Sequence, residues 1–167
     1  MSAVAERPLR GGGPAWRAGP GPATLVWIDT EQAIIGRCEG QADELTTEGI
    51  TSDVPAHHRS TGRIRHDPSR HGGGGPATDL IERSRQEHLR RFVELVAQRI
   101  PDDPVEILGP GTTRESLVRR LRERDVAHGV WRDIRCVPSE ALTERQFVAR
   151  LRFLAGRPAP RRRSPAS

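Results

Sequence analysis

Short apolar runs in this chain alternate with longer segments in which apolar residues recur every three to four positions. The first apolar run, residues 24–29, predicts a buried strand. Thr30 and Glu31 form a tight turn, and residues 33–38 predict the return strand of a hairpin. Residues 44–50 are a candidate third strand. The pattern therefore predicts that the ordered part of the chain begins with antiparallel strands.

Three later segments have the spacing of amphipathic helices. The first, residues 79–99, is followed by Pro101, which ends it. Its apolar stripe consists of Ile81, Leu89, Phe92, Val96 and Ile100. The second helix runs to about residue 124, and the third ends at Gly156. The residues expected to face the core from these two helices are Leu117, Val118, Leu121, Phe147, Val148, Leu151 and Leu154.

Two sequence signals mark where the second and third helices begin. Thr112 with Glu115, and Thr143 with Gln146, each have the spacing of a capping box, in which the two side chains satisfy free amides of the first turn. Between the helices, residues 104–108 and 133–137 predict two more strands.

The resulting order is hairpin, helix, strand, helix, strand, helix, which predicts an α/β fold with three layers and a mixed sheet. We expect one domain over residues 23–156, with a flexible polar loop at 51–78. Residues 1–22 and 157–167 are rich in Gly, Pro and Arg, and we expect both to be disordered tails.

Charge and composition narrow the function classes only slightly. All 27 basic residues are arginine and the chain has no tyrosine, so the pI of 10.9 overstates a formal net charge of +5. A GC-rich genome explains arginine in place of lysine without any nucleic-acid partner. No apolar run approaches membrane-spanning length. Cys38 and Cys136 are isolated and are expected to be small buried hydrophobes, which fits a reducing, cytoplasmic location.

The central loop carries the most suggestive chemistry. It contains four arginines, four histidines (His57, His58, His66 and His71) and a run of four glycines. Arginine forms bidentate hydrogen bonds with phosphate, and glycine lets the backbone approach a nucleic acid closely. We therefore expect an RNA-binding site here; the alternative is a solvated linker. The expected contact residues are Arg59, Arg63, Arg65, Arg70, His71, Gly72, Gly73, Gly74 and Gly75.

A glycine loop that leads into a long Arg-rich helix, then a short strand and the turn Gly109-Pro110-Gly111, resembles the middle domain of archaeal and eukaryotic peptide-chain release factors and of Pelota. The opening Val26-Trp27-Ile28-Asp29 also resembles short stand-alone bacterial relatives of that domain, described as translational-machinery or host-attachment proteins. The resemblance implies a ribonuclease-H-like fold, a ribosome or structured RNA as partner, and a role in stress or hibernation.

One departure from that family bears on activity. Release factors carry Gly-Gly-Gln in the loop, whereas Gly74-Gly75 is followed here by Pro76, which has neither a side-chain amide nor a backbone N–H. We therefore expect a non-enzymatic protein that does not hydrolyse peptidyl-tRNA. We expect no catalytic residue, metal, cofactor, membrane partner or small-molecule ligand.

Other interpretations stay open at this point. Asp29 ends the first strand and would be the metal ligand of a ribonuclease-H-like nuclease or phosphoesterase if Glu82 or Asp133 converged on it; otherwise it is a turn residue. The loop histidines are a candidate zinc site without a thiolate partner. The glycine turn at 109–113 lacks the lysine of a P-loop and is expected to be a tight strand–helix connection. A protein–protein adaptor with partner-recruiting tails is a third function class.

Overall fold

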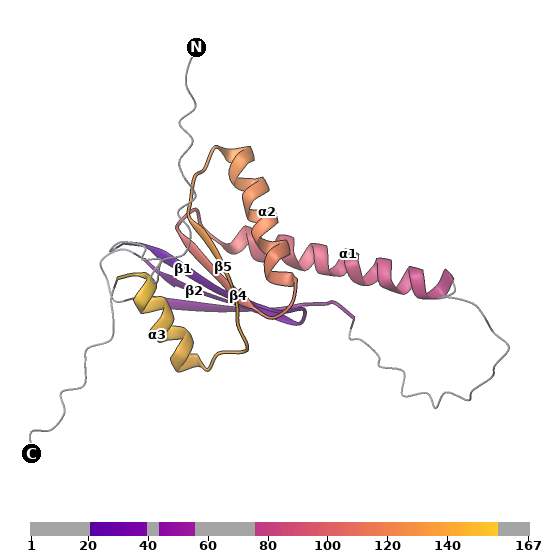
Figure 1. Cartoon of the computed structure of the whole chain (residues 1–167), viewed down its shortest axis with the longest axis horizontal. Helices are drawn as coiled ribbons and strands as arrows, with labels where there is room; N and C mark the ends of the chain where they lie inside the picture. The colour runs from indigo at the N-terminus through magenta and orange to yellow at the C-terminus, as the bar shows by residue number, and fades with distance from the viewer. Residues whose placement is uncertain (1–20, 40–43, 56–75, 157–167) are drawn as a thin grey trace, which may run out of the picture.

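The computed structural model describes residues 21–39, 44–55 and 76–156. In sequence order these residues form β1 (Ala23–Ile28), β2 (Gln32–Cys38), β3 (Leu45–Thr51), α1 (Pro76–Arg99), β4 (Val105–Gly109), α2 (Thr113–His128), β5 (Ile134–Pro138) and α3 (Glu144–Leu154) (Figure 1). The expected elements are confirmed: three strands before the central loop, three helices after it, and two strands between those helices. The predicted tails lie almost wholly outside the described residues, and the domain boundaries remain predictions.

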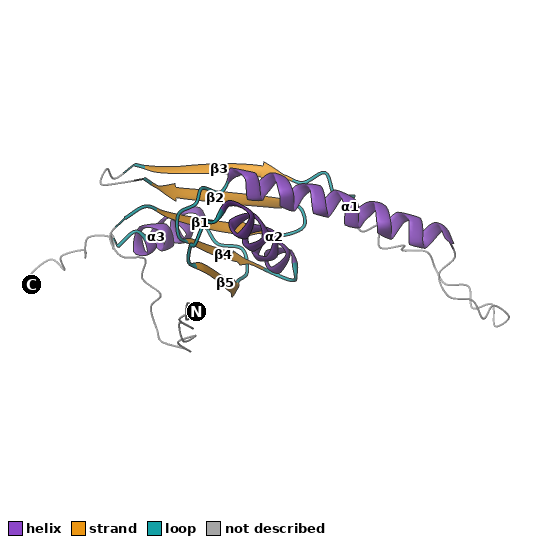
Figure 2. Ribbon diagram, turned by 90° about the horizontal axis from the view of Figure 1, so that it is seen from above, coloured by secondary structure: helices purple, strands orange, loops and turns teal. Residues whose placement is uncertain are grey.

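The strands form one sheet in the order β3-β2-β1-β4-β5. β1 is antiparallel to β2, which is antiparallel to β3, whereas β4 and β5 run parallel to β1. α1 and α2 pack on one face and α3 on the other (Figure 2). This confirms the predicted three-layer α/β fold with a mixed sheet. The parallel pairs arise because helices connect β3 to β4 and β4 to β5, so that each new strand starts at the same edge.

The core lies on both faces of β1, which is buried along its whole length because it is the central strand. Val26 and Ile28 face the helices α1 and α2, while Leu25 and Trp27 face α3. Gly36 of β2 lets α3 approach closely, since a Cβ atom there would lie 2.6 Å from Cε1 of the Phe147 ring.

A buried ion pair fixes α3 to the sheet. Glu106 on β4 is 0% exposed and faces α3. Both of its carboxylate oxygens accept from Arg150, at 2.7 Å from Nε and 2.6 Å from Nη2, and Arg135 of β5 lies 3.4 Å away. A buried carboxylate is costly unless it is paired and hydrogen-bonded. The arginine on α3 therefore sets where this helix lies over β4.

Two arginines and an aspartate hold the C-terminal end of α1. We call these residues the clamp: Arg124, Arg132 and Asp125. Arg132 is buried, with its Nε donating to Asp125 Oδ2 at 2.8 Å and its Nη1 donating to the Pro101 carbonyl. Arg124 donates to the Ile100 carbonyl at 2.8 Å and also to the carbonyl of Ala97. The last carbonyls of a helix lack partners within it and carry partial negative charge, so guanidinium groups stabilise them.

Only one of the two predicted capping boxes forms. At Thr143 the backbone is extended, Gln146 N donates to Thr143 Oγ1 at 3.3 Å, and Thr143 N donates to Gln146 Oε1 at 2.9 Å. At Thr112 the prediction is wrong: its backbone is already helical (φ −99°, ψ −7°) and its side chain makes no cap bond. A side-chain cap needs the extended conformation at this position. Glu115 instead pairs with Arg114 at 3.3 Å.

Two further predictions about burial are wrong. Ile81, placed on the buried stripe of the first helix, is 68% exposed because α1 extends past the sheet at its N-terminal end (Figure 1). Cys136 is exposed because β5 is an edge strand, whereas Cys38 is buried as expected. The central loop is also shorter than expected, since Thr51 belongs to β3 and residues 76–78 belong to α1.

Candidate nucleic-acid interface

Residues 52–55, which we call the stem, follow β3 and lead toward the predicted RNA-binding loop. The described part of the chain resumes at Pro76. Ser52 N donates to the Glu31 carbonyl at 2.7 Å, which ties the stem to the β1–β2 turn. Asp53 Oδ2 lies 3.1 Å from His88 Nδ1 on α1, which places the stem beside the middle of that helix. The near end of the predicted RNA-binding loop is therefore held beside His88.

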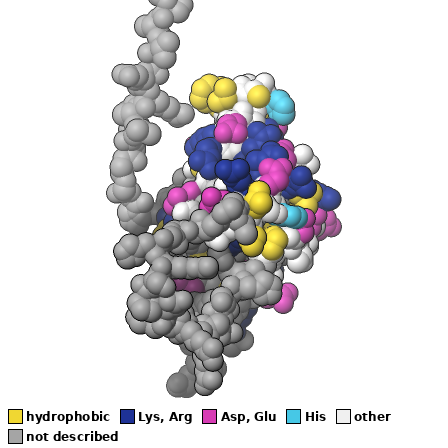
Figure 3. Space-filling model, turned by 90° about the vertical axis from the view of Figure 1, so that its right-hand side faces the viewer, with side chains coloured by type: hydrophobic (Ala, Val, Ile, Leu, Met, Phe, Trp, Pro, Cys, Tyr) yellow, Lys and Arg dark blue, Asp and Glu magenta, His cyan; other side chains and the backbone are white. Residues whose placement is uncertain are grey.

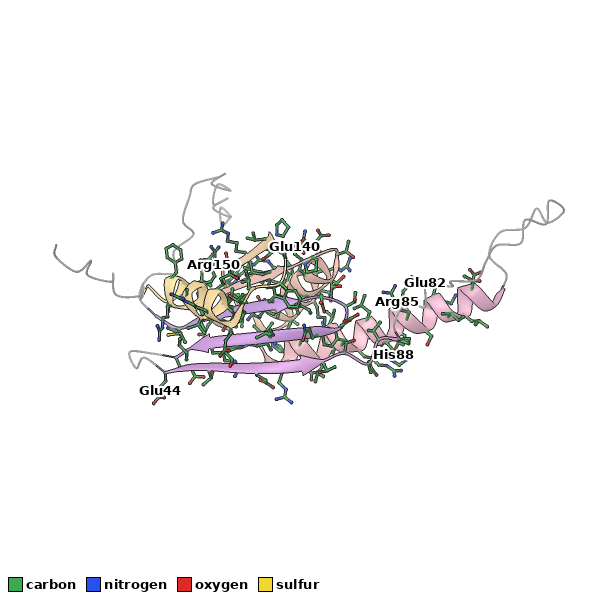
Figure 4. All side chains as sticks on the ribbon, turned by 90° about the horizontal axis from the view of Figure 1, so that it is seen from below. Glu44, Glu82, Arg85, His88, Glu140 and Arg150 are labelled. Carbon is green, nitrogen blue, oxygen red and sulfur yellow. The ribbon has the colours of Figure 1, made fainter. Side chains whose placement is uncertain are left out.

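The far end of the loop is the N-terminus of α1, which projects from the body; we call residues 76–88 the arm. The apolar stripe of α1 begins at Leu89, and the same face in the arm carries Arg85, Glu82 and Thr78 at helical spacing. The arm has no apolar stripe in line with Leu89, its Leu80 and Ile81 are exposed, and it runs past the sheet (Figures 1 and 4). At about 1.5 Å per residue, Pro76 lies roughly 18 Å along the helix from His88.

One carboxylate, that of Glu87, pairs with two arginines at the base of the arm. Glu87 accepts from Arg90 at 3.0 and 2.8 Å and from Arg91 at 3.1 Å. The hydrogen bonds from Arg90, more than its charge or that of Arg91, lower the pKa of Glu87 from 4.5 to about 2. Arg83 is exposed and has no carboxylate partner among the described residues. With Asp79, Glu82 and Glu87 against Arg83 and Arg85, the arm itself carries a formal charge of −1.

The excess of basic over acidic residues lies outside the described part of the chain. The described residues hold 16 arginines and 19 acidic residues, whereas residues 1–20, 40–43, 56–75 and 157–167 together hold 11 arginines and three acidic residues. The folded body is therefore formally acidic, and the net charge of +5 comes from the loop and the tails. The expected RNA-binding residues, Arg59, Arg63, Arg65, Arg70 and His71 to Gly75, all lie outside the described residues, so their placement stays a prediction.

A groove of about 570 Å³ runs between α1 and α2. Arginines and carboxylates alternate on this side of the molecule (Figure 3). Arg120 donates to both carboxylate oxygens of Glu94, one at 3.1 Å, and lies 3.4 Å from Glu123. The hydrogen bonds from Arg120 lower the pKa of Glu94 below its usual value. Because these charges are paired across the groove, we interpret it as the contact between two helices.

The structure gives Asp29 a turn role. Its Oδ1 accepts from Glu31 N at 2.7 Å and from Gln32 N at 2.8 Å, which closes the β1–β2 hairpin. Asp133 precedes β5 and so lies at the amino end of the parallel strands, whereas Asp29 follows β1 at their carboxyl end, and Glu82 is on the arm. These three candidate carboxylates therefore do not converge. Among the described residues no group of three ligands is placed to hold a metal ion.

The glycine turn between β4 and α2 is a tight connection, as expected. Gly109 has φ +148°, and a Cβ atom there would lie 1.9 Å from the Ile28 carbonyl oxygen. Arg114 Nη1 donates to the Gly109 carbonyl at 3.2 Å and to the Gly111 carbonyl. The turn brings β4 against the end of β1 and requires glycine at position 109.

Comparison with known proteins finds a likeness of fold only. No protein-family model matches this chain, and no curated protein sequence matches it significantly. Among solved structures, it is similar to an archaeal translation termination factor at 15% identity and a TM-score of 0.41, covering 83% of this chain and 35% of that one. It is also similar to the Pelota protein of Thermoplasma acidophilum at 15% identity and a TM-score of 0.37, covering 77% of this chain and 31% of that one. The chain thus spans about a third of the length of these proteins.

The described helices include none that is both long enough and apolar enough to cross a membrane.

Sequence analysis missed the buried Glu106–Arg150 pair and the clamp. Glu106 did leave a signal, because a charged residue stands inside the apolar run at 105–108 of a central strand. Such a residue needs a cationic partner on a neighbouring element. No local pattern in the sequence indicates which arginine is that partner.

Proposed function

We propose that this protein is a non-enzymatic RNA-binding protein, with the ribosome as the favoured target, and that it contacts RNA through the basic loop and the C-terminal tail. The separation of charge carries this proposal: the folded body is acidic, while the loop and tails carry nearly all the surplus arginine. Phosphate contacts supply most of the sequence-independent affinity for nucleic acids. An acidic body repels RNA on average, so the basic segments are the favoured place for the main contact.

The arm supports the proposal by its length. Its tip lies roughly 18 Å along α1 from His88. The Debye length at physiological ionic strength is about 8 Å, so the negative charge of the body is largely screened at that distance. An arginine-bearing loop attached at the tip therefore meets RNA phosphates without paying the electrostatic cost of bringing them to the body. On this interpretation α1 is a spacer.

The decisive experiment measures RNA affinity against salt. If Arg59, Arg63, Arg65 and Arg70 each contact a phosphate of single-stranded RNA, together they contribute roughly −3 to the log–log slope. Replacing all four with Gln should make the slope shallower by about that amount and leave the contribution of the remaining contacts. The matched control replaces Arg157, Arg161, Arg162 and Arg163 with Gln, which removes the same charge from the tail and reports its separate share. Wild-type protein that does not bind RNA at low salt, or binds with a flat salt response, contradicts the proposal.

Kinship with the release-factor and Pelota middle domain, a cytoplasmic location and a role in stress or hibernation belong to this proposal, and they rest on the sequence motifs. Co-sedimentation with ribosomes from stationary-phase cells tests them together. We expect the protein in the ribosomal fraction at low salt and its release at high salt. Recovery only in the soluble fraction under both conditions contradicts a ribosomal target, even if isolated RNA binds.

A further inference from the structure

One tryptophan stands on the surface of the body, far from any core. Trp131, in the connection between α2 and β5, is 95% exposed, and Val126 of α2 is 79% exposed. By contrast, Trp27 is 4% exposed and its indole N–H donates to the Glu140 carbonyl at 3.1 Å. A tryptophan offers a large amphipathic surface, and exposed examples are enriched at binding sites.

The exposure of Trp131 comes from a rigid backbone. Gly129 ends α2 in the left-handed conformation (φ +67°), and Val130 N donates to the Asp125 carbonyl at 2.9 Å. On the other side, Arg132 is held in the clamp with its side chain 1% exposed. The residues that flank Trp131 are therefore fixed from both directions. A contact surface that is ordered before binding loses little entropy when a partner arrives.

Two arginines without carboxylate partners lead to this tryptophan. Arg119, Arg122 and Val126 share one face of α2 at helical spacing, and Arg122 Nη1 donates to the Arg132 carbonyl at 3.2 Å, which places it beside Trp131. Arg119 bonds only to Ser116 Oγ, at 3.5 Å. Most other described arginines pair with an acid, but neither of these two does within the described residues. Figure 3 shows arginines over α2 below hydrophobic side chains and a histidine at its C-terminal end.

We propose that Trp131, Arg119 and Arg122 form a second RNA contact, in which an unpaired base stacks on the indole ring and its phosphates bind the two guanidinium groups. This inference rests on the proposed function and adds a contact on the acidic body itself. Base stacking on aromatic side chains, with arginines along the backbone, is how single-stranded nucleic acids are held. The C-terminal end of α2 repels anions, so the base occupies Trp131 and the phosphates lie toward Arg119. The two unpaired cations favour an anionic partner over an apolar protein surface.

The test compares a ligand that has bases with one that has only charge. The probe is a fluorescently labelled single-stranded oligoribonucleotide, titrated at fixed low salt, with heparin as the base-free polyanion. Trp131→Ala should weaken RNA binding between about fivefold and about 100-fold and leave heparin binding unchanged. Trp131→Phe should restore part of the loss. Arg122→Gln should weaken both ligands and lower the salt slope by about one.

Matched controls keep a folding defect apart from a lost contact. Leu95→Ala removes a partly exposed apolar side chain on α1, 41% exposed, and should leave RNA binding unchanged. A denaturant melt of each variant reports whether it is folded. RNA affinity unchanged in folded Trp131→Ala, while the four-Gln loop variant binds weakly, overturns this inference and leaves the proposed function standing. Equal loss of RNA and heparin also overturns it, because stacking cannot act on heparin. Wild type that binds no RNA at all overturns both.

Discussion

The two halves of α1 differ sharply in how much apolar surface they bury. From Leu89 onward the helix buries Phe92, Val96 and Ile100 against the sheet, and the clamp holds its C-terminal carbonyls. The arm buries almost nothing, and its Ile81 faces solvent. Isolated helices of this length are marginal in water, so the arm depends on continuity with the buried half. Packing therefore stabilises one half, and the other extends it into solvent.

The largest contrast should come from apolar truncations in each half. Phe92→Ala should cost about 3–5 kcal/mol of unfolding free energy, because it leaves a cavity under the sheet-facing stripe. Ile81→Ala should change it by no more than about 0.5 kcal/mol, because the side chain is already in water. Denaturant melts of the two variants measure the difference. Similar losses at both positions show that the arm packs against something in solution.

Breaking the ion pair beneath α3 should have the next largest effect. Arg150→Ala leaves Glu106 buried with only Arg135 nearby, and should cost about 2–3 kcal/mol because the arginine is partly exposed and its pairing is partly screened. The matched control is Arg83→Ala on the arm, which should change the unfolding free energy by less than about 0.5 kcal/mol. If Arg150→Ala melts like wild type, water reaches Glu106 and the pair does not hold α3.

Acid should loosen the arm before the body. The folded pKa of Glu87 is about 2, below its ordinary 4.5, because of the Arg90 hydrogen bonds. A lowered pKa means that its stabilisation is present above about pH 4.5 and is lost as pH falls toward 2. Residue-level hydrogen exchange between pH 5 and pH 2.5 should show faster opening at the arm than at residues 92–99. In Glu87→Gln the arm should open faster already at pH 5 and respond less to acid. Arm protection that stays constant from pH 5 to pH 2.5, after correction for the intrinsic pH dependence of amide exchange, contradicts this role.

The smallest effect should come from deleting the tails. Removing residues 1–20 or 158–167 takes away Gly, Pro and Arg residues with little apolar area, so the unfolding free energy should stay within about 0.5 kcal/mol of the full chain. Thermal melts of the two deletions decide it. A deletion that costs as much as Phe92→Ala moves the domain boundaries and shows that a tail completes the core.

The sequence predicted the elements well where a local pattern determines them. The hairpin follows from two apolar runs around Asp29, and the box at Thr143 forms as its spacing indicates. The same spacing failed at Thr112, because the preceding glycine turn sets a helical backbone there. Helical periodicity placed Ile81 on the buried stripe, but it carries no information about where the sheet beneath a helix ends.

Hydrogen-bond partners that are distant in the sequence could not be predicted from local patterns. Arg150 meets Glu106 across 44 positions, and Arg124 meets the Ile100 carbonyl across 24. Any of the 27 arginines fits such a role by residue type, so only the fold selects among them. The RNA-binding residues of the loop are the opposite case: charge and glycine content point to them, while their placement stays a prediction. No sequence pattern predicts that Trp131 is exposed, because its exposure depends on the contacts that the clamp makes with other elements.

The clamp has a mechanical consequence. A helix held at one end and free at the other is a cantilever, so a sideways pull at its tip produces the greatest bending moment near the support. For α1 the tip is Pro76, and the support begins at Leu89, where the helix packs on the sheet, and extends to the last turn, which the guanidinium groups of Arg124 and Arg132 hold. Tension applied through the loop therefore bends the helix most near Leu89, and the clamp keeps its far end in place. The same Arg132 adjoins Trp131, so the support of the lever and the surface tryptophan share one anchoring residue.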